Sequence, residues 1–225
     1  GRHGATSDHA GGARMTPFIT ETGPGVALPM DNIDTDQLIP ARFMKRSRTE
    51  GYGEQLLFDL RHHADGSKRA DMALNHLSAP PMLLIGGANF GCGSSREAAV
   101  YALVDHGIRC VVARSFADIF RNNASRNGLL TVACDGADHT ALTEYLSAAP
   151  GEAVTADLKA QTISWGQQQG FAFDIDANVR RRLLLGMDEL SETLEYSKEI
   201  EDFEHRYRQR HPWMAPYSPG FPGRV

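Results

Sequence analysis

Three short apolar segments, separated by helical patterns, constrain the fold of this chain more than any other feature. Strands are predicted over residues 82–86 (MLLIG), 109–113 (RCVVA) and 129–133. Helices are predicted between them, over residues 95–106 and 116–127. A strand–helix–strand–helix–strand order at this spacing predicts parallel strands joined by right-handed crossovers.

The flanking segments have other patterns. Residues 16–39 are rich in strand-forming residues, and the piece from Thr22 to Gly25 predicts a turn. Residues 153–175 alternate between apolar and polar residues, with polar turns between the runs, which predicts antiparallel strands. The sequence therefore predicts an α/β protein whose parallel and antiparallel parts follow each other along the chain.

The length of 225 residues and a hydrophobic content of 41% suit a single domain with a sizeable core. We expect that domain over residues 15–176, followed by a charged helical segment over 177–210 and an extended, proline-rich tail over 211–225. Residues 1–14 are rich in Gly, Ala and His. They are expected to be a disordered extension or an artificial remnant.

Charge and composition exclude several classes of function. The formal net charge is -5, whereas a nucleic-acid-binding domain normally carries a basic surface. No apolar run approaches the ~18 residues of a membrane span, and no signal peptide is recognisable. The odd count of three cysteines favours a reducing cytoplasm. Because no two cysteines have the close spacing of metal or cluster ligands, no metal site is predicted in this chain.

Residues 89–97 (NFGCGSSRE) carry the most informative pattern, because they lie between a predicted buried strand and a predicted helix. Ser94 and Glu97 fit the capping-box pattern, which makes Ser94 the expected N-cap. The glycines allow a ligand to approach the backbone, and Arg96 offers a planar fork that matches a carboxylate. These residues predict a site for a carboxylate or phosphate beside two hydroxyl groups.

A simpler interpretation of the same stretch is a capped helix after a tight turn, with Arg96 exposed to water. Other enzyme motifs fit worse. A phosphate-binding P-loop needs a lysine that is missing here. A hydrolase nucleophile elbow needs glycine two residues after its serine, where this chain has Arg96.

Four segments together resemble a known family. GCGSSRE is similar to the signature of the swivelling domain of the aconitase superfamily, a three-layer β/β/α fold. DNIDTDQLIP with ARFMKRSRTEGYG, then SFADIFRNNASRNGLL, and finally LLLGMDELSETLEYSKEIEDFE, resemble segments of bacterial isopropylmalate dehydratase small subunits. The resemblance runs in the expected order from about Pro17 to His205. It implies one swivelling domain of the aconitase type.

The resemblance also implies a reaction and roles for particular residues. Ser94 would be the catalytic base, acting as an alkoxide, while Gly93, Ser95 and Arg96 would bind the carboxylate of a small dicarboxylate substrate. The reaction would convert 2-isopropylmalate to 3-isopropylmalate by dehydration and rehydration, in leucine biosynthesis. The family's [4Fe–4S] cluster belongs to a large subunit, so this chain would bind no cofactor and would be inactive without that partner.

In the same family a mobile loop contacts the variable side chain of the substrate and determines selectivity for it. Residues 42–52 are similar to this loop. Phe43 and Met44 would contact the isopropyl group, and Arg46 or Arg48 would pair with a carboxylate. The alternative is a basic loop that only faces water. The related hydro-lyases that act on citraconate, methylmalate or homoaconitate-like acids differ in this loop, and they remain an alternative function.

Some features have structural interpretations. A divalent metal could bind Asp31, Asp34 and Asp36, but these side chains are expected instead to cap the turns before the loop.

Two functions of other classes remain open: a stand-alone serine hydrolase that uses Ser94, and a non-enzymatic regulator that binds dicarboxylates. The hydrolase would need a histidine and a carboxylate partner that no motif supplies.

Overall fold

The computed structural model describes residues 15–45, 50–187 and 197–211. The predictions for Arg46, Arg48, residues 1–14 and most of the tail lie outside these residues. The chain divides into two compact units, residues 1–187 and 188–225. The first holds the sheet with its covering helices, and it includes helix α6 (Ala177–Leu185), which lies beyond the expected domain boundary at residue 176.

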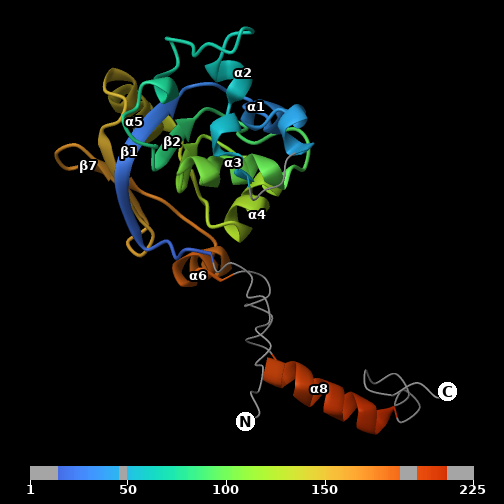
Figure 1. The fold of residues 1–225 in the computed structure, drawn as a ribbon. Coiled ribbons are helices and arrows are strands. Elements are labelled where there is room, and N and C mark those ends of the chain that lie inside the picture. The colour runs from blue at the N-terminus through green and yellow to red at the C-terminus, as the bar shows by residue number, and fades with distance from the viewer. Residues whose placement is uncertain (1–14, 46–49, 188–196, 212–225) are drawn as a thin grey trace, which may run out of the picture. The chain divides into compact units, whose positions relative to one another are not determined.

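The described part of the first unit contains one seven-stranded sheet in the order β4-β3-β2-β1-β5-β6-β7. Figure 1 shows the long strand β1 beside β2 in this sheet. Its parallel half confirms the three predicted strands, which are β2 (Leu83–Gly86), β3 (Cys110–Ala113) and β4 (Leu130–Ala133). Its antiparallel half confirms the alternating pattern, and consists of β5 (Ala153–Asp157), β6 (Thr162–Trp165) and β7 (Gln169–Ala172).

The long strand β1 (Thr20–Leu28) joins the two halves. Its first part pairs antiparallel with β5, and its last four residues, from Gly25, pair parallel with β2. The predicted turn from Thr22 to Gly25 is therefore wrong, because these residues lie inside the strand. Close packing requires the glycines here, since a Cβ on Gly25 would lie 2.8 Å from Leu146 and 2.9 Å from Val154.

Alternation along the strands separates two clusters of core residues on opposite faces of the sheet. Leu84 and Val111 point to the face covered by α3 (Glu97–His106) and α4 (Asp118–Arg126). Leu83 and Val112 point to the other face, which packs against α5 (Gly136–Ala148) and the antiparallel strands. Helices, central strands and the antiparallel strands thus form the three layers of the predicted α/β fold.

Shorter elements complete the described fold. After β1 come α1 (Thr35–Leu38), the 3-10 turn η1 (Ala41–Lys45), η3 (Gly53–Gln55), α2 (Phe58–Arg61) and η4 (Ala73–Asn75). In the second unit the described helix is α8 (Ser197–Arg210). None of the helices described is long and apolar enough to cross a membrane.

Candidate functional site

The loops that follow β1 and β2 lie side by side and hold each other through backbone hydrogen bonds. Gly91 N donates to Ile33 O at 2.7 Å, and Thr35 N donates to Cys92 O at 2.9 Å. The buried Thr35 hydroxyl then donates to Ser94 O at 3.0 Å. Because both loops leave the carboxyl ends of parallel strands, these bonds place Ser94 where open α/β sheets commonly bind ligands.

The predicted capping box at Ser94 and Glu97 is wrong. Helix α3 begins at Glu97, its N-cap is Arg96, and no side chain caps it. The Glu97 carboxylate instead accepts a hydrogen bond from Asn127 Nδ2 at 2.8 Å, while Ser94 O accepts one from Arg96 N at 2.7 Å. The Ser94 side chain is exposed and is not used in a helix cap.

A capping box does form one loop earlier, at the start of α1. Asp34 accepts a hydrogen bond from Gln37 N at 2.7 Å, and the Gln37 side chain accepts one from Asp34 N at 2.9 Å. Asp31 accepts a hydrogen bond from Ala88 N at 2.6 Å. The expected turn cap is therefore confirmed for Asp34. Asp31 instead connects the loop after β1 to the loop after β2, and Asp36 pairs with Arg96.

A cavity of about 270 Å³ opens beside Ser94. Gly91, Gly93, Ser94 and Arg96 line it from the β2 loop, and the others come from α1 and from the start of α4: Thr35, Ala117, Asp118, Ile119, Phe120 and Asn123. Gly91, at φ +74°, permits the tight fit, because a Cβ there would lie 2.2 Å from Phe120. The cavity thus combines one exposed hydroxyl, one guanidinium, the Asp118 carboxylate, the Asn123 amide and an apolar wall.

Arg96 is not the water-exposed residue of the simpler interpretation. Its side chain is 23% exposed, and its Nη1 donates a hydrogen bond to the Asp36 carboxylate. This ion pair orients the guanidinium, and the remaining N–H groups of the fork are available to a second carboxylate. The local chemistry can therefore bind an acid and place a hydroxyl group against it.

The structure brings only part of the predicted set together. Gly93, Ser94 and Arg96 line the cavity, whereas Ser95 is exposed and is not among its lining residues. Phe43 and Met44 are half-buried against one of the two core clusters, and they do not line the cavity either. The Phe43 ring lies 5.0 Å from the Phe58 ring.

Sequence reasoning missed three cavity contributions: the contact of Thr35 with Ser94, the ion pair of Asp36 with Arg96, and the wall formed by the start of α4. The signal that could have identified them is the family resemblance itself, since DNIDTDQLIP and SFADIFRNNASRNGLL contain all of these residues.

The cysteine thiols are unsuited to binding a cluster. Cys110 is fully buried in β3, and burial raises the pKa of its thiol. Burial, with Asp138 and Asp135, raises the pKa of Cys134 to about 11. Burial and then Asp34 raise the pKa of Cys92 in the site loop. Within the described ranges no three His, Cys, Asp or Glu side chains converge as metal ligands.

Comparison with known proteins identifies the relatives of this chain. Residues 15–136 match the model of the aconitase C-terminal domain, and residues 193–216 match that of the C-terminal domain of the 3-isopropylmalate dehydratase small subunit. The chain is 48% identical to the 3-isopropylmalate dehydratase small subunit of Anaeromyxobacter dehalogenans strain 2CP-C over 191 residues, covering 84% of this chain and 98% of that one.

A second relative is the small subunit of Rhizobium etli, which is 40% identical over 202 residues and covers 89% of this chain and 100% of that one. Among solved structures, the 3-isopropylmalate dehydratase of Methanocaldococcus jannaschii is similar, with a TM-score of 0.61 and 24% identity. The match covers 83% of this chain and 99% of that chain, and it supports the fold.

Proposed function

The chain belongs to the family of 3-isopropylmalate dehydratase small subunits, and we propose that its Ser94 loop supplies the proton-transfer group of that hydro-lyase. The observation that carries the proposal is the exposed Ser94 side chain in a cavity shared with Arg96. Serine in a helix cap would be committed to the backbone, whereas this serine can face a substrate.

Ser94 is proposed as the base that removes a proton from the carbon next to a substrate carboxylate. Arg96 and Ser95 hold that carboxylate, and Gly93, at φ +93°, lets the loop backbone come close to it. Loss of the proton with the hydroxyl group of the neighbouring carbon gives isopropylmaleate. Addition of water in the opposite sense gives the isomeric isopropylmalate.

A serine hydroxyl loses its proton only in an environment that stabilises the alkoxide. Nearby cations, backbone donors and exclusion of water provide such an environment. Arg96 supplies a cation, and Ile119 with Phe120 supplies an apolar wall. Ile119 is 52% exposed in this chain. We propose that this wall packs against the large subunit, which completes the exclusion of water.

The large subunit is also the proposed carrier of the [4Fe–4S] cluster. This chain's own thiols do not fit one, because Cys110 is fully buried and no three potential metal ligands converge among the described residues. On its side of the interface, this chain provides the Ser94 loop.

The selectivity of the enzyme is proposed to reside in the loop over residues 42–52, through Phe43, Met44, Arg46 and Arg48. Support comes from its connection to the site: η1 follows α1 directly, and Thr35 in α1 holds the Ser94 loop. Phe43 and Met44 are half-buried, so they are apolar surfaces of the kind an isopropyl group requires.

The test of the base is Ser94→Ala in the two-subunit enzyme, assayed by the absorbance of isopropylmaleate. We expect turnover to fall by about 10²- to 10⁴-fold, because general acid–base catalysis typically contributes that much. Size-exclusion chromatography should show unchanged assembly with the large subunit. Ser95→Ala is the matched control, with an effect mainly on KM. Near-normal turnover of assembled Ser94→Ala would show that another group is the base.

A further inference from the structure

A second cavity, of about 200 Å³, lies where the loops after β1, β2 and β3 meet helix α5. It shares no lining residue with the cavity beside Ser94. The polar groups that line it include Asp31, Arg114, His139, Thr143 and Glu144. Since one water molecule occupies about 30 Å³ of liquid, the cavity has room for a small organic molecule.

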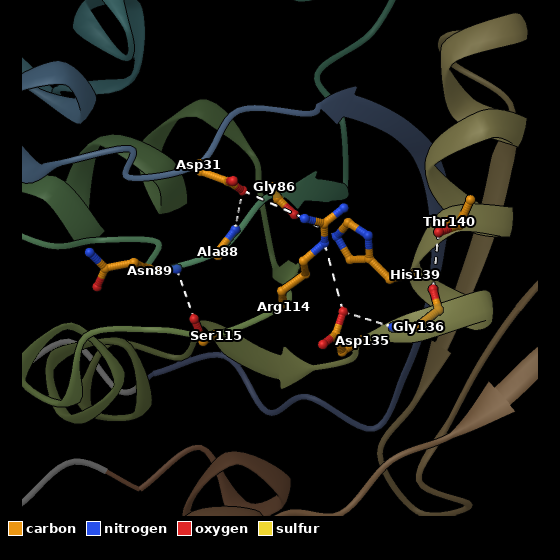
Figure 2. Close-up of polar contacts among 10 residues, drawn as sticks. All are labelled: Asp31, Gly86, Ala88, Asn89, Arg114, Ser115, Asp135, Gly136, His139 and Thr140. Carbon is orange, nitrogen blue, oxygen red and sulfur yellow. Dashed lines mark hydrogen bonds and ion pairs between the residues drawn. The ribbon is translucent and has the colours of Figure 1, made fainter.

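His139 is the most informative of these residues. It is 3% exposed, and its Nε2 donates a hydrogen bond to Gly86 O at 2.7 Å (Figure 2). Because a carbonyl can only accept, Nε2 carries the proton, and in that tautomer Nδ1 is an acceptor. In the described part of the chain Nδ1 has no hydrogen-bond partner.

Thr143 lies four residues further along α5 and therefore on the same side of the helix as His139. Its Oγ1 is also buried, and within the described residues it too has no partner. Buried polar atoms in folded proteins are nearly always hydrogen-bonded. Both atoms belong to residues that line one cavity on one helix face. There Nδ1 can accept a hydrogen bond, and the Thr143 hydroxyl can accept or donate one.

Arg114 supplies a positive charge to the same cavity. It lies between Asp31 and Asp135, with nitrogen–oxygen distances of 4.0 and 3.8 Å (Figure 2). Both distances exceed those of a hydrogen bond, so the planar fork of the guanidinium is still available to a carboxylate. Asp31 and Glu144 also line the cavity, and their charges oppose the binding of a simple anion.

We propose that this cavity binds a small α-amino acid, whose ammonium group donates to His139 Nδ1 and Thr143 Oγ1 and whose carboxylate pairs with Arg114. The ammonium group also meets the carboxylates of Asp31 and Glu144, so each charge of the zwitterion faces its opposite. A metal ion fits less well, because no three potential ligands converge in the described ranges. The proposal does not depend on the role of Ser94.

The test is calorimetric titration of the assembled two-subunit enzyme with glycine, L-alanine and L-leucine. Propionate and ethylamine serve as analogues of alanine that each lack one charged group. We expect saturable binding of at least one amino acid, and binding of each analogue weaker by about tenfold or more, since each loses charge-assisted hydrogen bonds. Absence of saturable binding by all three amino acids would overturn the proposal, as would equal binding of propionate.

Three variants locate the site without altering the buried imidazole. Thr143→Val and Arg114→Gln should each weaken amino-acid binding by about tenfold, while turnover of isopropylmalate stays unchanged. Thr140→Val is the matched control, because Thr140 lines the same cavity but its hydroxyl already donates to Gly136 O at 3.0 Å. Unchanged affinity in Thr143→Val, or an equal loss in Thr140→Val, would refute the assigned ammonium site.

Discussion

At the scale of single residues, the hydroxyl groups of Thr35 and Ser94 have different roles in the proposed site. Thr35 is buried and donates its hydroxyl to the backbone of Ser94, whereas the Ser94 side chain is exposed to the cavity. Asp36 fixes the guanidinium of Arg96. Thr35 and Asp36 thus act through the residues that we propose to contact substrate.

Replacing Thr35 with valine should lower kcat with little change in KM. Valine keeps the shape of threonine but removes the donor to Ser94 O, and a hydrogen bond of ~1 kcal/mol corresponds to a several-fold loss of rate. Steady-state kinetics of the two-subunit enzyme would measure both constants. Thr35→Ser keeps the donor and should restore most of kcat. A serine variant as impaired as the valine variant would argue against a positioning role.

At the scale of elements, a short capped helix organises the site loops. The capping-box pattern at Asp34 with Gln37 forms at the start of α1, whereas the pattern at Ser94 with Glu97 does not form at α3. Glu97 is instead bonded to Asn127, at the end of α4. Contacts between elements therefore determine which of the two capping boxes forms. They leave Ser94 outside helix α3.

Removal of the cap that forms should destabilise the chain. We expect Asp34→Ala to lower the free energy of unfolding by ~1 kcal/mol, the usual effect of losing an N-cap acceptor. Urea denaturation of the full chain would measure it. Asp34→Asn keeps an acceptor for Gln37 N and should lose much less. Equal stability of Asp34→Ala and the unaltered protein would show that the capping box contributes nothing.

The loop after α1 leads to a prediction about selectivity. Phe43→Ala should change the ratio of kcat/KM values for substrates with shorter and longer alkyl groups, because a methylene-sized difference is worth ~1–3 kcal/mol in an apolar pocket. Maximal rate should change less. Met72→Ala, which removes a half-buried side chain from the same core cluster outside this loop, is the control. An unchanged ratio in Phe43→Ala would remove Phe43 from the proposed selector.

At the scale of the whole molecule, the sheet, its helices and the loops over residues 50–75 form one packed unit. Gly53 in η3 lies so close to the end of α3 that a Cβ there would be 2.5 Å from Asp105 O. His106 Nδ1 donates to Gly53 O at 2.8 Å across this contact. Burial, and then the charge of Arg61, lower the pKa of His106 from its ordinary value of 6.5.

This lowered pKa predicts how stability depends on pH. Above the unfolded pKa of 6.5 the histidine is neutral in both states, so its native contacts contribute fully. As the pH falls below that value, the unfolded chain binds the proton first, and folding stability decreases. We expect His106→Gln to flatten the decrease between about pH 7 and about pH 5 in denaturant unfolding curves. Parallel curves for the two proteins would exclude His106 as a cause.

Local patterns in the sequence are enough to predict the parallel and antiparallel strands, the family and the position of the Ser94 loop, because periodicity and contiguous motifs involve neighbouring residues. The strand over residues 22–25 depends instead on tertiary packing, since Gly23 packs against Met82 and Gly25 packs against Leu146 and Val154, all far along the chain. The same holds for the ion pair of Asp36 with Arg96, and for the cavity beside His139. These features depend on contacts between distant residues, which no local pattern specifies.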